Sequence, residues 1–256
     1  MSRTDSKIPN KVKILNILID NITLDELLIK CDKGIVVTPN VDHLIHLQSD
    51  KLFYNLYQKA DFVINDSQII KYASSFLKDP LKEKISGADF FPAFCSYHAT
   101  NDNIKIFLLG AKRGVSTVAK NKINTKYNRK LIVDNYSPSI GFEKNDIECI
   151  DIVNKINNSE ANVLVIGVGA PKQEKWLLKY HDRFSKIKIF MLLGATIDFE
   201  AGIIKRSPKW MSSLGLEWLF RITQDPFRLW KRYLINDTPF FWLVLKQKFG
   251  LYKNPF

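Results

Sequence analysis

The sequence of 256 residues has few cysteines, and none of them has the spacing of a disulfide framework or a metal site. Cys31, Cys95 and Cys149 stand alone along the chain, with no CxxC pair. This pattern argues against structural disulfides and zinc fingers, and it fits a reducing compartment. We therefore expect a cytoplasmic protein.

Long hydrophobic runs are also missing. A membrane-spanning helix needs about 18 or more apolar residues, whereas the longest late run covers only Phe240 to Leu245. The segment Met1 to Lys7 lacks the apolar region of a secretory signal peptide. We expect neither a spanning helix nor a signal peptide.

Acidic residues are few relative to basic ones. Asp and Glu number 26 against 38 Lys and Arg, which gives a net charge of +12. Such a balance predicts a polyanionic partner, which is a nucleic acid, an anionic lipid surface or a phosphorylated substrate. The remaining composition, 46% hydrophobic and 25% charged, is ordinary for a globular protein with one sizeable core.

Apolar runs alternate with helical patterns along the chain. This alternation predicts an α/β fold, a mostly parallel Rossmann-like sheet with helices on both faces. We expect a catalytic domain over residues 1–202 and a basic helical appendage over residues 203–256. The predicted strands cover residues 12–19, 34–38, 62–64, 104–109, 131–133, 163–166 and 188–193, and helices are expected at 21–31 and from 41 to about 58.

The most informative stretch runs from Val163 to Leu178 and reads VLVIGVGAPKQEKWLL. A strand that enters a helix through a glycine turn presents backbone N–H groups to an anion. A dinucleotide fingerprint would need a third glycine where Lys172 stands, and no P-loop is present. The turn is either a tight connection or an anion site, and the polar triplet Lys172-Gln173-Glu174 favours the second.

This block resembles the Gly-x-Gly-x-Pro-Lys-Gln-Glu-x-Trp signature of the WecG/TagA/CpsF family of bacterial glycosyltransferases. The basic segment from Lys205 to Tyr233, with its Lys-Arg-Ser-Pro-Lys-Trp and Gly-Leu-Glu-Trp-Leu-Phe-Arg stretches, is similar to the C-terminal signature of that family. The resemblance extends over roughly residues 12–235.

The resemblance implies three catalytic residues. Asp66 matches the family's proposed general base, although Ser67 replaces the usual glycine after it; a carboxylate after a strand is otherwise a cap or turn residue. Thr38 and Asn40 match a Thr-x-Asn that lines the family's active site, while Asn40 alone also suits a helix cap. Asp89 is either a helix cap, which we favour, or an acceptor-binding group.

Further residues are expected to bind substrate. A second glycine turn, Gly110 to Gly114, carries two cations and suits a phosphate, and the loop from Tyr136 resembles the family's substrate-side loop. The complete set is Gly110, Ala111, Arg113, Tyr136, Gly167, Gly169, Pro171, Lys172, Gln173, Glu174, Arg206, Arg221, Arg228 and Arg232.

The sequence offers little to bind a metal. His43 and His46 are spaced as two ligands on one helix would be, but no third ligand is evident nearby, and the Asp-x-Asp of many metal-dependent transferases is missing. We expect a metal-independent enzyme without a cofactor, in which UDP-sugar is a substrate.

Residues 203–233 combine cations with aromatic residues at helical spacing and contain only two acids, Glu217 and Asp225. This composition is typical of helices that bind a membrane interface. Two alternatives stay open: the helices only cover the core, or the segment binds nucleic acid, for which no recognised module is present.

The resemblance implies an inverting glycosyltransferase that moves a hexose, an N-acetylhexosamine such as N-acetylmannosamine, or a hexuronate. The donor would be a UDP-sugar, and the acceptor a polyprenyl-diphosphate-linked sugar at the cytoplasmic face of the membrane. The expected partners are these substrates and an anionic membrane surface rather than nucleic acid, and a homo-oligomer is left open. A non-enzymatic nucleotide- or RNA-binding α/β protein is the alternative; the missing glycine opposes an NAD-dependent oxidoreductase.

Overall fold

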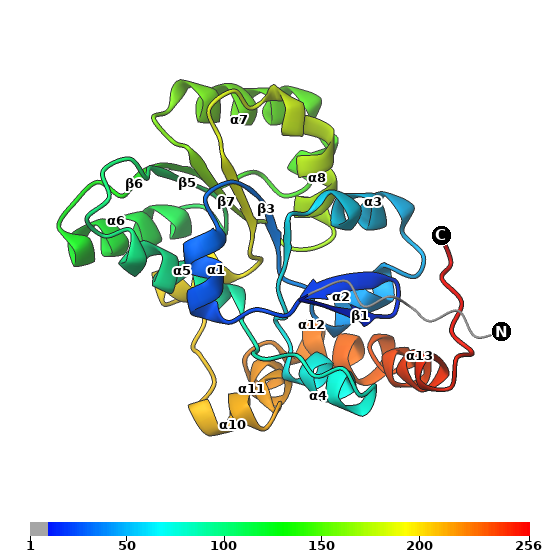
Figure 1. Cartoon of the computed structure of the whole chain (residues 1–256). Coiled ribbons are helices and arrows are strands. Elements are labelled where there is room, and N and C mark those ends of the chain that lie inside the picture. The colour runs from blue at the N-terminus through cyan, green and yellow to red at the C-terminus, as the bar shows by residue number, and fades with distance from the viewer. Residues whose placement is uncertain (1–9) are drawn as a thin grey trace.

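The computed structural model describes residues 10–256, except for the side chains of Lys209 and Arg228. Its centre is a parallel sheet in the order β4-β3-β8-β7-β5-β6 (Figure 1). The strands are β3 (Gly34–Val37), β4 (Phe62–Val63), β5 (Ile106–Gly110), β6 (Ile132–Tyr136), β7 (Val163–Gly167) and β8 (Ile189–Leu192). The predicted α/β class is confirmed.

Helices cover both faces of the sheet, so its central strands are buried on both sides. Alternate residues of β7 face opposite clusters: Leu164 lies in one, and Val163 and Val165 in the other. The first cluster includes residues of α2 (Val41–His46), α3 (Lys51–Lys59), α4 (Gln68–Phe76), α7 (Asp146–Asn158) and α8 (Lys172–Tyr180). The second includes residues of α1 (Leu24–Lys30), α5 (Gly87–Tyr97), α6 (Val115–Tyr127) and α9 (Thr196–Ala201).

Two sequence predictions about local structure were wrong. The expected first strand is a hairpin of β1 (Lys11–Ile14) and β2 (Ile17–Asp20), because the chain reverses at Leu15, whose φ is +52°. The expected long helix after residue 41 is two helices. Asp50 accepts a hydrogen bond from the backbone of Phe53 (3.1 Å) and caps the start of α3.

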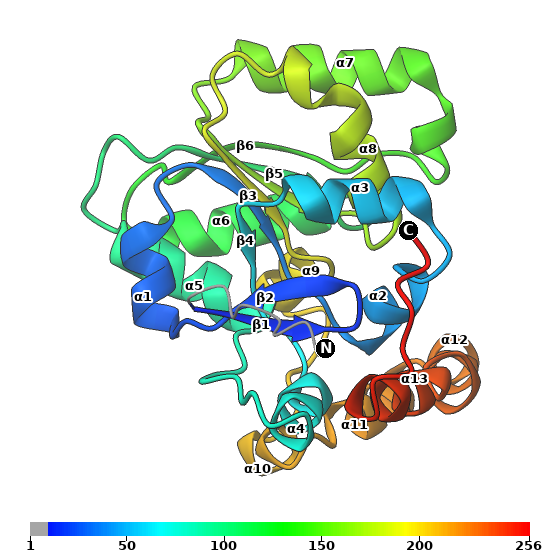
Figure 2. The ribbon, with the colours of Figure 1, turned by 45° about the vertical axis from the view of Figure 1, so that its right-hand side comes forward.

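The C-terminal segment divides into two parts. Residues 203–238, which we call the arm, carry α10 (Lys209–Ser213), α11 (Glu217–Gln224), α12 (Pro226–Lys231) and the π-helical turn η3 (Arg232–Asn236). The arm, α13 (Pro239–Lys248) and α4 form a layer beneath the sheet domain in both ribbon views (Figures 1 and 2).

Helix α13 packs as part of the core rather than standing apart from it as an appendage. Phe240 and Val244 are buried in the cluster that covers one face of the sheet. Gln247 accepts a hydrogen bond from the backbone of Leu15 (2.7 Å), and Tyr252 donates one to Gln48 (2.7 Å). Residues after 238 thus contribute to the core, and the division into a domain of residues 1–202 and an appendage of residues 203–256 stays a prediction.

Replacement of Phe240 by alanine tests this packing. We expect Phe240→Ala to lower the free energy of unfolding by about 3–5 kcal/mol, because it empties a fully buried aromatic site. The matched control is Phe241→Ala, whose side chain is 59% exposed and should cost less than about 1 kcal/mol. Urea unfolding of both variants gives the comparison; equal losses would contradict a core role for α13.

Candidate active site

The arm and the carboxyl ends of β3 and β4 enclose a cavity of about 290 Å³. In open α/β sheets, ligands bind outside the carboxyl ends of the strands. The core lines the cavity with Asn40, Asp66 and Lys84, and the arm lines it with Glu217, Arg221, Arg232 and other residues. A larger cavity of about 510 Å³ lies at the amino ends of β3 and β8, on the edge opposite these side chains.

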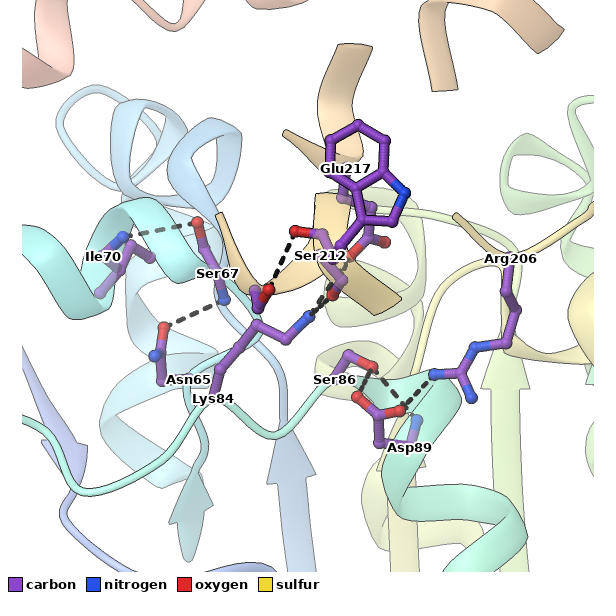
Figure 3. Close-up of polar contacts among 11 residues, drawn as sticks. Asn65, Ser67, Ile70, Lys84, Ser86, Asp89, Arg206, Ser212 and Glu217 are labelled. Atoms are coloured by element: carbon purple, nitrogen blue, oxygen red, sulfur yellow. Dashed lines mark hydrogen bonds and ion pairs between the residues drawn. The ribbon is translucent and has the colours of Figure 1, made fainter. Parts of the chain in front are cut away.

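Asp66 follows β4 and lies at the cavity wall. The capping function that the sequence left open for it belongs to Ser67, whose hydroxyl accepts the backbone N–H of Ile70 (3.4 Å) at the start of α4 (Figure 3). Burial raises the pKa of Asp66 to about 8, and the negative charge of Glu217 adds to this; Lys84 and Arg221 act in the opposite direction. A carboxyl that titrates near neutral pH in a cavity is suited to general acid–base chemistry.

Asn40 has both functions that the sequence left open. Its side chain accepts the backbone N–H of His43 (3.2 Å) and so caps α2, and it also lines the cavity. Thr38 lies deeper: its buried hydroxyl donates to the carbonyl of Leu192 (3.3 Å) and joins β3 to β8. The structure thus shows a positioning contact for Thr38, and its catalytic role stays a prediction.

Arg232 of the arm points into the protein. Its guanidinium lies 3.3 Å from the carboxylate of Asp42 and donates to the side-chain oxygen of Asn40 (3.3 Å). Asp237 is buried close by. Burial and the charge of Asp42 raise the pKa of Asp237 to about 7, against the effect of Arg232. Arg232 therefore fastens the arm to the start of α2 beside the cavity.

A second contact joins the arm to α5. Arg206 forms an ion pair with Asp89 (Figure 3). We had expected Asp89 to cap α5, but the cap is Ser86. The Ser86 hydroxyl accepts a hydrogen bond from the backbone N–H of Asp89 (3.1 Å) and donates one to the Asp89 carboxylate (2.5 Å). Burial acts to raise the pKa of Asp89, but the hydrogen bonds from Ser86 and Arg206 hold this pKa below its usual range.

The glycines at the carboxyl ends of β5 and β7 allow backbones to meet. A Cβ at Gly110 would lie 2.5 Å from backbone atoms of Gly167, and one at Gly167 would lie 2.7 Å from the carbonyl of Gly194. Gly169, at φ +83°, faces open space. These close approaches explain the glycines at 110 and 167 by packing, and the predicted phosphate contacts of the turns stay predictions.

The polar triplet at the start of α8 turns partly inward. Gln173 and Glu174 are each 1% exposed, whereas Lys172 is exposed. Gln173 accepts the backbone N–H of Gly194 (3.3 Å) and donates to Glu174 (2.8 Å), so it ties the turn after β7 to the turn after β8. The backbone N–H of Gln173 already bonds the carbonyl of Gly169 (3.1 Å) and is not offered to an anion.

The other predicted substrate residues are spread along the same edge, outside the cavity. Ala111 and the exposed Arg113 follow β5, and Pro171 precedes α8. Tyr136 ends β6 and donates to Glu148 of α7 (3.4 Å). The side chain of Arg228 lies outside the part that the structure describes. Of the residues that the sequence proposed separately, the structure brings Asn40, Asp66, Arg221 and Arg232 together in the lining of the cavity.

Sequence reasoning missed Lys84, Ser212 and Glu217. Lys84 donates to the Ser212 hydroxyl (2.7 Å) and lies 3.3 Å from the Glu217 carboxylate (Figure 3). One signal was present, because Glu217 is one of only two acids in a strongly basic segment.

The two histidines make contacts within the protein. A ring nitrogen of His43 lies 2.7 Å from the Tyr57 hydroxyl, and His46 lies 3.8 Å from Asp42. Burial, aided by Arg232, lowers the pKa of His43 to about 3. Over residues 10–256 no three His, Cys, Asp or Glu side chains are grouped to hold a metal ion. Nor does this part of the chain contain a helix of the length and apolarity that crossing a membrane requires.

Comparison with known proteins gives the class of this chain. Residues 12–254 match the model of the Glycosyl transferase WecG/TagA/CpsF family, and the chain belongs to that family. It is therefore a glycosyltransferase, which sets aside the non-enzymatic alternative.

Curated relatives support the assignment. The chain is 28% identical over 235 residues to an N-acetylglucosaminyldiphosphoundecaprenol N-acetyl-beta-D-mannosaminyltransferase of Staphylococcus aureus strain MRSA252, and 27% identical to the enzyme of that name from strain MW2. Each match covers 87% of this chain and 86% of the relative.

The buried carboxyl of Glu174 gives a pH prediction. Burial raises its pKa to about 7, so between its unfolded value and pH 7 the folded state binds more protons, and stability falls as the pH rises through that window. Glu174→Gln cannot ionise. We expect the unfolding free energy of the variant, relative to that of the wild type, to rise by about 2 kcal/mol when the pH is raised from 5 to 8. Urea unfolding at both pH values measures this; an unchanged difference would contradict it.

Proposed function

We propose that this glycosyltransferase moves a sugar of the N-acetylmannosamine type from a UDP-sugar to a polyprenyl-diphosphate-linked sugar, with inversion at the anomeric carbon. The names of the relatives, which describe a lipid-diphosphate-linked N-acetylglucosamine and transfer of N-acetylmannosamine, support this choice. The observation that carries the proposal is the position of Asp66, at the wall of a cavity that the arm closes.

In this mechanism Asp66 is the general base. The acceptor hydroxyl oxygen attacks the anomeric carbon, the bond from that carbon to the UDP oxygen breaks, and the hydroxyl proton moves to the Asp66 carboxylate. Negative charge grows on the departing UDP. Arg221 lines the same cavity and supplies a fixed positive charge, which stabilises this transition state without reorganisation.

The role of Asp66 is tested by Asp66→Asn, which keeps the size of the side chain but cannot accept the proton. We expect the transfer rate to fall on the order of 10²–10⁴-fold, while UDP binding persists. Rates are measured as UDP release in the presence of a short-chain lipid-diphosphate-sugar, and binding by calorimetry. Turnover within about threefold of the wild type would remove Asp66 from this role, since loss of a general base has a larger effect.

We also propose that transfer requires no metal ion, because cations of the chain are available to balance the diphosphate charge. Activity should persist in excess EDTA. Loss of transfer that added Mg²⁺ or Mn²⁺ restores would contradict this proposal.

We further propose that the arm and α13 dock on the anionic cytoplasmic face of the membrane, where a lipid-linked acceptor would lie. Large apolar side chains are exposed here, among them Phe227 (94%), Trp230 and Trp242. Exposed lysines accompany them, including Lys231. Each cation near such a surface contributes about 1 kcal/mol, and inserted aromatic side chains add to the affinity.

The double variant Phe227→Ser/Trp230→Ser tests this docking. We expect its binding to vesicles that contain anionic lipid to fall at least tenfold in a co-sedimentation assay, since buried apolar area is lost. Ile140→Ser is the matched control, because Ile140 is fully exposed in a loop between β6 and α7, far from the arm in sequence. If both variants bind like the wild type, the arm only covers the core.

A further inference from the structure

One contact between the arm and the core places a carboxylate and an ammonium group in the cavity that Asp66 lines. Lys84 precedes α5 and has a side chain only 14% exposed; Glu217 begins α11 and is 37% exposed. The ammonium of Lys84 binds the Ser212 hydroxyl (2.7 Å) and the Glu217 carboxylate (3.3 Å). Lys84, Ser212 and Glu217 all line the cavity that Asp66 lines.

The pair brings opposite charges to bear on Asp66. Glu217 disfavours ionisation of the Asp66 carboxyl, whereas Lys84 favours it. The remaining charged groups around Asp66 are Arg221, on the same helix α11 as Glu217, and Asp89 of α5. Arg232 and Asp237 line the cavity from the end of the arm, and the Tyr57 hydroxyl of α3 feels the Asp66 charge.

We propose that Glu217 is a positioning residue: it holds the Lys84 ammonium away from Asp66, so that Asp66 is a strong base only while the arm is docked. Lys84 belongs to the core, and both groups that hold it belong to the arm. When the arm leaves, Lys84 loses Ser212 and Glu217 together, and the Asp66 carboxylate becomes an available partner. Docking of the arm and basicity of Asp66 are then linked. This inference rests on the proposed role of Asp66.

The pH profile of kcat/KM separates this role from simple docking, because it reports the ionisation of groups in the unliganded enzyme. Glu217→Gln removes the negative charge but keeps the side chain and its hydrogen-bonding capacity. We expect the acid limb of the profile to move to lower pH by about one unit, because loss of one charge from the same cavity changes the pKa of Asp66 by that order. The plateau at high pH should fall, since a weaker base accepts the proton less readily.

Two further variants test the direction in which the acid limb moves. Lys84→Met removes the positive charge, so its acid limb should move to higher pH by a similar amount, and activity lost at pH 7 should return as the pH rises. In the double variant Lys84→Met/Glu217→Gln no ammonium is left for Glu217 to hold, so the acid limb should stay close to that of Lys84→Met. An acid limb that returns to the wild-type position would show that Glu217 acts only through its own charge, and would overturn the inference.

Ser212→Ala is the matched control, because it removes one hydrogen bond to Lys84 but leaves the Glu217 carboxylate in place to hold the ammonium. It should leave the acid limb close to the wild-type position. The inference is overturned if Glu217→Gln behaves like Ser212→Ala, or if it changes nothing. Should Glu217→Gln fail to fold, Lys84→Met decides alone, and an unmoved limb overturns the inference. Activity of Asp66→Asn would instead show that the proposed function fails.

Discussion

The structure depends on balancing charges that are partly buried between the sheet edge and the arm. Asp66 and Asp237 lie there with pKa values raised to about 8 and about 7. Bare charges in such a place are costly unless they are paired or neutralised. The arm supplies Arg221 and Arg232 as cations, and it also brings Glu217, which engages Lys84 of the core. Docking of the arm and ionisation of Asp66 therefore depend on the same set of charged groups.

Core packing places this charged layer. Helix α13 inserts Phe240 into the main cluster and holds the hairpin turn through Gln247. It follows the arm directly in the chain, so the arm is fixed at its far end by buried contacts. At its near end Arg206 binds Asp89. Between these points the arm exposes aromatic side chains outward and presents charged ones to the cavity. One segment thus closes the cavity and carries the aromatic side chains that we propose for contact with a lipid surface.

Much of the fold could be predicted from the sequence, since buried parallel strands read as continuous apolar runs and glycine turns mark their ends. The capping role of Asn40 and the position of Asp66 also followed from local patterns. The hairpin at Leu15 did not, because tertiary contacts override local periodicity. The break before Asp50 was missed although Asp is a usual residue at a helix start. Lys84 and Glu217 lie 133 residues apart, so only the fold could bring them together. The burial of Gln173 and Glu174 could not be predicted either, because polar residues at a helix start are usually exposed.

The central claim is that Asp66 drives a single displacement of UDP by a lipid-linked sugar. The most direct measurement is an incubation with UDP-N-acetylmannosamine and a short-chain lipid-diphosphate-N-acetylglucosamine, with the linkage of the product read by NMR. The account predicts stoichiometric UDP release and a product whose anomeric configuration is opposite to that of the donor. A product with retained configuration, or no transfer from any UDP-sugar, would contradict it.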